Sequence, residues 1–138
     1  MEGGFIMSKL GVVLVSHSAD IANGLKDIVD EMNDGTVTVM AAGGADEGRI
    51  GTSAVKIMEA MEALADNDYI LVYADLGSSI MSAETAVEML EEEVADKIRM
   101  VDCPIVEGAL AGVVEGCVSG DLDSVIKASE AAREVRKF

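Results

Sequence analysis

The chain has 138 residues, of which half are apolar and 3% aromatic, so it is long enough to fold as one domain around an aliphatic core. Its 26 Asp and Glu residues outnumber 10 Lys and Arg residues and give a net charge of −16 at pH 7. This balance excludes the dense basic patch that binding to nucleic acid or to an anionic membrane requires, and it suits a basic protein partner. No apolar stretch is long enough to span a bilayer.

Short apolar runs alternate with amphipathic segments in the first half of the chain. Residues 10–15 (LGVVLV) are typical of a strand that is covered on both faces. A helix is expected after this strand. Residues 33–35 (NDG) predict the turn that ends this first helix, and residues 36–42 predict the second strand. The first helix is marked by an apolar stripe of Ile21, Leu25, Ile28, Val29 and Met32. The second helix is marked by Ala54, Ile57, Met58, Met61 and Leu64.

The same alternation continues in the second half. Residues 69–74 (YILVYA) and 98–101 predict the third and fourth strands, and a final helix is expected over residues 122–135. Pro104 is expected in the first turn of the helix that precedes this final one. The third helix is marked by Ala83, Val87, Leu90 and Val94, and the fourth by Ile105, Ala109, Val113 and Cys117. Residues 7–138 are therefore predicted to form a single α/β domain, and residues 1–6 are interpreted as an extension or alternative start.

This order of elements predicts an open, mainly parallel sheet of four to five strands with helices on both faces. In such sheets, ligands and reactive groups gather where the strands end. All four predicted strands end in polar or Gly-rich loops. These loops are residues 16–18 (SHS), 42–49 (AGGADEGR), 75–79 (DLGSS) and 102–104 (DCP).

His17, the only histidine, is the candidate nucleophile. A neutral imidazole attacks phosphorus well near pH 7 and forms a phosphoramidate. Asp75 ends the third strand, which lies beside the first in a flavodoxin-like strand order, so its carboxylate is the candidate that orients His17. Backbone N–H groups and hydroxyls at helix starts can receive phosphate oxygens. The candidate phosphate-binding residues are Ser18, Gly43, Gly44, Gly77, Ser78 and Ser79.

Simpler interpretations of the same residues stay open. A lone histidine at a strand end is more often structural, Asp75 could only cap the following helix, and the glycines could only serve turn geometry. Cys103 and Cys117 lack the spacing of a zinc or redox motif, so we expect two free, buried thiols and neither metal nor cofactor. A receiver domain of two-component signalling is disfavoured, because no acidic pair follows the first strand.

Four segments resemble the phosphotransferase subunit of the phosphoenolpyruvate-dependent dihydroxyacetone kinase. They are residues 13–25 (VLVSHSADIANGL), 41–53 (AAGGADEGRIGTS), 74–86 (ADLGSSIMSAETA) and 102–112 (DCPIVEGALAG). The domain of that subunit is similar to the mannose-type enzyme IIA domain of the bacterial sugar phosphotransferase system. The resemblance covers the chain from about Met7 to its end, and its second and third segments are the most specific.

The resemblance implies a cytoplasmic homodimer that acts as a phosphocarrier. His17 would match the phosphorylated histidine, as tele-phosphohistidine, and Asp75 the orienting carboxylate. The phosphoryl donor would be the phosphocarrier HPr, a separate protein because the chain stops at Phe138. The acceptor would be ADP held on the nucleotide subunit of the kinase.

Two other functions remain as alternatives. The chain could be the enzyme IIA of a mannose-type sugar permease, which passes its phosphoryl group to an enzyme IIB. It could also be a non-catalytic regulatory module of the same fold. The role of Arg49 is left open between phosphate or partner contact and a surface ion pair with Asp46 or Glu47.

Overall fold

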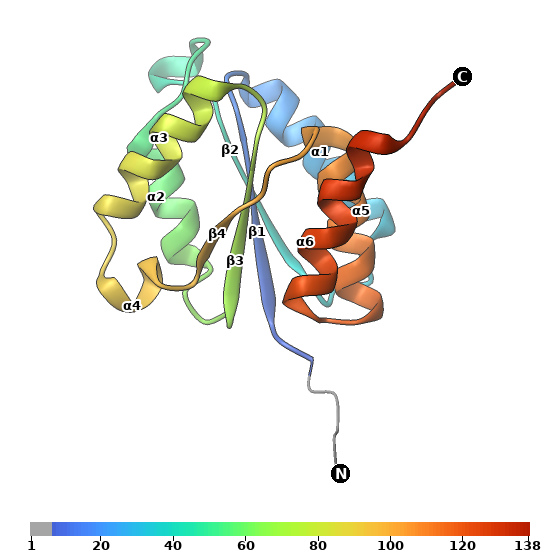
Figure 1. Ribbon diagram of the computed structural model, residues 1–138. Coiled ribbons are helices and arrows are strands. Elements are labelled where there is room, and N and C mark those ends of the chain that lie inside the picture. Colours follow the sequence, from blue (N-terminus) through green and yellow to red (C-terminus); the bar gives the residue numbers. More distant parts are fainter. Residues whose placement is uncertain (1–6) are drawn as a thin grey trace.

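Four parallel strands form the sheet in the computed structural model, which describes residues 7–138 (Figure 1). Within this part of the chain the strand order is β2-β1-β3-β4, so the third strand lies beside the first. The predicted fold class and strand order are confirmed. The strands are β1 Leu10–Ser16, β2 Thr38–Gly43, β3 Tyr69–Ala74 and β4 Ile98–Met100.

The central strand β1 brings the ends of its two neighbours to one edge of the sheet. Ser16 is paired with Gly43 of β2, and Val15 is paired with Ala74 of β3. All residues of β1 are buried, because helices cover both faces of the sheet. The loops that begin after Ser16, Gly43 and Ala74 therefore start side by side.

Two helical layers enclose the sheet, and Figure 1 shows them on either side of it. Successive residues of β1 point to opposite faces of the sheet and pack in different apolar clusters. Val12 and Leu14 belong to one cluster, and Val13 and Val15 belong to the other. One layer contains α1 Ala19–Met32, α5 Ile105–Val118 and α6 Leu122–Ala131, followed by η2 Ala132–Glu134. The other contains α2 Ala54–Ala63, α3 Gly77–Glu88 and α4 Glu92–Ala95, and the loop before α2 carries η1 Asp46–Gly48.

Helix α5 packs closely because glycine recurs on its buried face. A Cβ atom added to Gly112 would overlap the Tyr73 hydroxyl and the Ser129 hydroxyl. These two hydroxyls form a buried hydrogen bond of 2.8 Å. The absence of a side chain at this position lets α5 approach the sheet and α6 together.

We expect Gly112→Ala to destabilise the fold by about 1–3 kcal/mol, because the new methyl group overpacks a filled core. The free energy of unfolding in urea measures the effect. Gly24→Ala is the matched control, since a Cβ atom on this exposed residue of α1 meets nothing within 4 Å. The control should gain about 0.5–1 kcal/mol from better helix propensity. Equal stability of the two variants would contradict the packing argument.

The apolar stripe predicted for the first helix lies on α1, where Leu25 and Val29 are buried and Ile21, Ile28 and Met32 are half exposed. Two details of the predicted helices are wrong. Pro104 is the N-cap of α5 and not part of its first turn. The predicted final helix is shorter, since α6 gives way to η2 at residue 132.

The predicted third helix is divided into α3 and α4. Residues 91–93 (EEE) explain the break. Negative side chains are unfavourable near the C-terminus of a helix and favourable at the N-terminus, so this run ends one helix and starts the next. Leu90 and Val94 still pack against the apolar cluster that this helical layer forms with the sheet.

The two thiols are free as expected but only partly buried. Burial raises the pKa of Cys103 to about 11, so this thiol stays protonated at neutral pH. Within residues 7–138 we find no helix with the length and hydropathy needed to cross a membrane. Residues 1–6, interpreted above as an extension, lie outside the described residues.

Candidate active site

His17 lies in the turn between β1 and α1, at the edge where β1 and β3 end. Its carbonyl oxygen accepts a hydrogen bond of 2.8 Å from the Gly51 N–H group. Ser18 is the N-cap of α1, and its hydroxyl accepts from the Ile21 N–H group at 3.3 Å. The backbone on both sides of the imidazole is therefore fixed.

Asp75 holds His17 through both the ring and the backbone. Its Oδ1 lies 3.0 Å from Nδ1 of the ring, and its Oδ2 accepts from the His17 N–H group at 3.0 Å. The His17 side chain is 22% exposed and that of Asp75 is 15% exposed. The imidazole is thus anchored on its inner side, while the rest of the ring reaches the surface.

Further donors surround the Asp75 carboxylate. Oδ1 accepts from the Ser79 hydroxyl at 2.6 Å and from the Leu76 N–H group at 2.8 Å, and Oδ2 accepts from the Ser16 hydroxyl at 2.9 Å. Burial alone would raise the pKa of Asp75. The hydrogen bonds from Ser79, His17 and Ser16 outweigh it and lower this pKa to about 2. Asp75 is therefore ionised at neutral pH.

The ionised carboxylate selects the tautomer of the neutral imidazole. Because Asp75 can only accept hydrogen bonds, Nδ1 carries the ring hydrogen and Nε2 keeps its lone pair. Ser79 Oγ also lies 3.0 Å from Nδ1, and its hydrogen points to Asp75. On the outer side, Ser78 Oγ lies 2.5 Å from Nε2 and can donate to its lone pair. Nε2 is therefore the ring nitrogen whose lone pair points away from Asp75.

We expect the Asp75 carboxyl to titrate near pH 2, below its ordinary value of 3.8. Since the folded pKa is lowered, the stabilisation from this group is fully present above pH 4 and disappears as the pH falls from about 4 to 2. Carboxyl carbon NMR shifts of the ¹³C-labelled chain measure the midpoint directly. A midpoint near 4 would show that the hydrogen bonds do not stabilise the charged form.

Two of the three predicted glycines at this edge, Gly43 and Gly44, have close backbone contacts, whereas a Cβ atom on Gly77 would meet nothing within 4 Å. A Cβ atom on Gly43 would lie 2.6 Å from the Ser18 carbonyl oxygen, so glycine lets β2 approach the start of α1. The Gly44 N–H group donates to the Ser16 carbonyl oxygen at 3.0 Å, and its φ of +79° suits glycine. Gly77 is the first residue of α3. Phosphate binding by Ser18 and these glycines stays a prediction.

Ser16 is a site residue that our sequence analysis did not select. It is fully buried, donates to Asp75, and accepts a hydrogen bond of 3.1 Å from the Ser18 N–H group. The available signal was a polar residue at the end of a fully apolar strand. Such a buried hydroxyl needs a hydrogen-bond partner, and the loop after the neighbouring strand β3 supplies Asp75.

Arg49 lies in the loop between β2 and α2, and neither of its predicted surface ion pairs is found. Within the described residues it makes no ion pair with the carboxylates of Asp46 or Glu47. Its Nε donates instead to the backbone carbonyl of Asp46 at 3.3 Å. The Arg49 side chain therefore bonds to the backbone of the loop that carries it.

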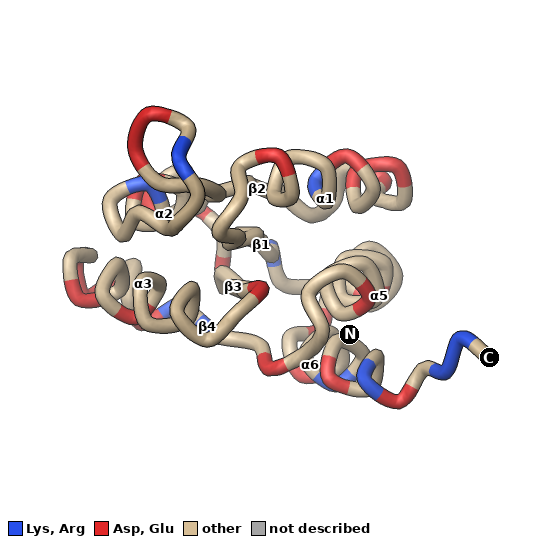
Figure 2. Tube along the Cα trace, turned by 90° about the horizontal axis from the view of Figure 1, so that it is seen from above, with Lys and Arg blue, Asp and Glu red and all other residues tan. Residues whose placement is uncertain are grey.

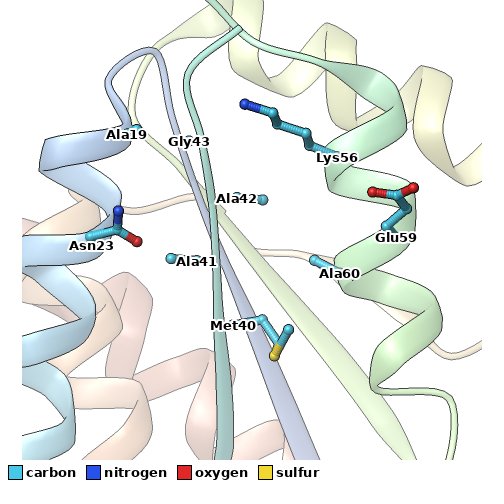
Figure 3. Close-up of a pocket in the computed structure, with 9 residues that line it drawn as sticks. All are labelled: Ala19, Asn23, Met40, Ala41, Ala42, Gly43, Lys56, Glu59 and Ala60. Atoms are coloured by element: carbon cyan, nitrogen blue, oxygen red, sulfur yellow. The ribbon is translucent and has the colours of Figure 1, made fainter. Parts of the chain in front are cut away.

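A cavity of about 440 Å³ opens along the free edge of β2, between α1 and α2 (Figure 3). Lys56 and Glu59 project toward it from α2, and Asn23 from α1. His17 and Asp75 are not among its lining residues, so the cavity is separate from the imidazole site. Within residues 7–138, no group of three or more His, Cys, Asp or Glu side chains is placed to hold a metal ion.

A known protein family matches most of this chain. Residues 11–126 match the EIIA-man model, described as the PTS system fructose IIA component. The chain is 36% identical over 118 residues to the phosphoryl donor subunit DhaM of PEP-dependent dihydroxyacetone kinase 2 from Listeria innocua. This alignment covers 86% of the chain and 94% of the relative.

A longer curated relative and a solved structure are also similar to this chain over most of its length. The chain is 43% identical over 132 residues to the phosphoryl donor subunit DhaM of the PEP-dependent dihydroxyacetone kinase of Escherichia coli, covering 91% of the chain but only 28% of that relative. The crystal structure of a protein of unknown function, EF1359, superposes with a TM-score of 0.82 at 36% identity. It covers 96% of this chain and 98% of that one.

Proposed function

Because the chain belongs to the EIIA-man family of phosphotransferase-system components, we propose that it is a phosphocarrier whose phosphoryl group rests on His17. The proposal depends on one observation above all, the His17–Asp75 pair at 3.0 Å. This pair directs the Nε2 lone pair away from Asp75, toward the exposed Ser78 hydroxyl. The relatives named above are phosphoryl donor subunits of dihydroxyacetone kinases, so we assign the same process to this chain.

The transfer runs in two steps on the same nitrogen. In the first step, the Nε2 lone pair attacks the phosphorus atom in line and forms the N–P bond. The bond between phosphorus and the donor atom breaks, and its electron pair stays on the donor. The phosphorylated ring keeps its hydrogen on Nδ1 and is cationic. The ionised Asp75 at 3.0 Å stabilises this charge. In the second step an acceptor oxygen attacks phosphorus, and the N–P electrons return to Nε2.

Two serines at the start of α3 contact different sides of the ring. Ser79 is fully buried and fixes Asp75 from within. Ser78 contacts Nε2, so its hydroxyl must turn away when the nitrogen attacks, and it can then donate to a phosphoryl oxygen. On this chain, the positioned imidazole and the hydrogen bonds around it stabilise the charge that develops.

The partners in this proposal follow from the resemblance. HPr is the donor, and ADP held on the nucleotide subunit of the kinase is the acceptor. The carrier acts in the cytoplasm as a homodimer. The E. coli relative is much longer than this chain, so the complete set of partners also remains a proposal. Transfer to an enzyme IIB of a sugar permease is the second candidate, but the names of the curated relatives favour the kinase.

Reconstitution tests the proposed process. The chain is incubated with phosphoenolpyruvate, enzyme I and HPr, and then with the two other kinase subunits, ADP and dihydroxyacetone. We expect dihydroxyacetone phosphate to form only when the chain is present. Phosphorylation of the chain without any product would refute the kinase assignment while retaining the phosphocarrier. Replacing the kinase subunits with an enzyme IIB then tests the permease alternative.

A further inference from the structure

The outer face of α5 is apolar, although it points away from the sheet. Leu110, Ala111 and Val114 are partly exposed there, and Val118 is 74% exposed. Only two of the 14 residues of α5 are charged. A helix at the surface of a monomer usually has a polar outer face, so an apolar one indicates that another molecule covers it.

A groove of about 390 Å³ runs between α5 and α6 on this outer face. Eight of the nine described residues that line it are apolar, and two of them, Met32 and Val135, are more than half exposed. Among these described residues only Glu107 is charged, and its carboxylate lies 2.7 Å from Nζ of Lys137. We call the surface formed by Met32, Leu110, Ala111, Val114 and Val135 the α5 face.

The two ends of the α5 face carry opposite charge. Helices α1 and α5 both start at the edge where the strands end, and α6 runs back toward that edge (Figure 1). Val135, after α6, therefore lies toward this edge, and Met32, at the end of α1, lies toward the opposite one. Residues 127–137 carry four of the ten Lys and Arg residues but only two of the 26 Asp and Glu residues, and Figure 2 shows blue segments between α6 and the C-terminus. On α1, exposed Asp27 and Glu31 precede Met32 and make the other end acidic.

We propose that the α5 face binds a second copy of this chain about a two-fold axis, with the two α5 helices antiparallel. The inference deepens the homodimer of the proposed function, since it assigns the surface that forms it. In this arrangement the basic end of each copy meets the acidic end of the other, and the groove of each copy is covered by the same apolar surface of its partner. Two chains with a net charge of −16 repel each other, so a stable contact between them requires a surface that is apolar and carries both signs of charge.

This dimer leaves both histidines accessible. His17 and Asp75 are not among the residues that line the groove, and they lie at the edge of the sheet where β1 and β3 end. With the α5 helices antiparallel, the two imidazoles lie at opposite ends of the dimer. Each chain therefore accepts its phosphoryl group independently, and the monomer should be as reactive as the dimer.

Sedimentation velocity of the full chain over a range of concentrations tests the proposal. We expect the wild type to sediment as a dimer. Val114→Glu and Val135→Glu should each raise the dissociation constant of the dimer by about 10–100-fold, because a carboxylate would be buried in an apolar contact. Val55→Glu is the matched control. Val55 is 53% exposed on α2, in the other helical layer, so the same change of charge there should leave the dimer intact.

Two further measurements separate assembly from folding and from chemistry. Val135 lies beyond the last helical turn, so the far-UV circular dichroism of Val135→Glu should match that of the wild type, and phospho-HPr should phosphorylate both at the same rate. A monomeric wild type, a dimer that neither groove variant weakens, or an equal loss of dimer in Val55→Glu would overturn the assignment of the α5 face. A wild-type dimer that is not phosphorylated would instead refute the proposed function and leave this assignment standing.

Discussion

Replacing His17 by alanine should abolish phosphorylation of the chain by phospho-HPr. The substitution removes the only imidazole of the sequence, and no other group near Asp75 can form a phosphoramidate. The fold should persist, because Asp75 keeps its hydrogen bonds from the backbone N–H group of residue 17, from Ser16 and from Ser79. The measurement is incorporation of ³²P from labelled phosphoenolpyruvate in the presence of enzyme I and HPr.

The chemistry of the label provides the control for this result. A phosphoryl group on histidine is lost in acid and stable in alkali, whereas one on an aspartate is lost in alkali. The wild type should carry one acid-labile, alkali-stable group per chain. A cooperative thermal unfolding transition of His17→Ala is expected and would establish that the variant is folded. Label that persists in this variant would place the phosphoryl group elsewhere and refute the phosphocarrier mechanism.

Replacing Asp75 by asparagine should slow phosphoryl transfer to His17 by about 10²–10⁴-fold, on the scale that loss of the orienting carboxylate has in a histidine–aspartate pair. An asparagine can donate to Nδ1 through its NH₂ group, which moves the ring hydrogen to Nε2 and removes the nucleophilic lone pair. It also loses the negative charge that stabilises the phosphorylated ring. Quench-flow measurement of a single turnover gives the rate, and ¹⁵N NMR shifts of the ring show which nitrogen carries the hydrogen.

Asp102→Asn is the matched control for the change in charge. Asp102 follows β4, and its side chain is 89% exposed. This variant has the same net charge as Asp75→Asn but keeps the His17 contacts, so its transfer rate should stay within about twofold of the wild type. An equally small effect of Asp75→Asn would show that the carboxylate does not control the reactivity of the imidazole.

In the proposed carrier, the His17–Asp75 pair selects the reactive nitrogen whatever the donor. Asp75→Asn should therefore lower the rate of transfer with phosphoramidate, a small donor, as well as with phospho-HPr.

The sequence alone was sufficient for the order of the strands and for the proximity of His17 and Asp75. Strand β3 was predicted with its observed bounds, residues 69–74, because a strand buried on both faces is a continuous apolar run between polar loops. Parallel strands connected by helices end at the same edge of the sheet. The positions of His17 and Asp75 after two such strands therefore predicted that they lie close together, before any side-chain geometry was known.

Other features depended on contacts between segments far apart in the sequence. Ser78 and Ser79 are adjacent and chemically identical, yet one contacts Nε2 at the surface and the other is buried against Asp75. The phase of α3 against β1 determines this difference, and a local pattern does not contain that phase. The same holds for Ser16, whose partner is 59 residues away.

The anchored histidine illustrates the division between the two levels. Residue type and strand order determined that an imidazole and a carboxylate share one edge of the sheet, because both follow from local periodicity and the topology it implies. Only the tertiary structure decided which ring nitrogen faces the carboxylate and which faces solvent. That choice depends on the directions of the two side chains. The packing of α1 and α3 against β1 and β3 sets these directions, and no local sequence pattern encodes them.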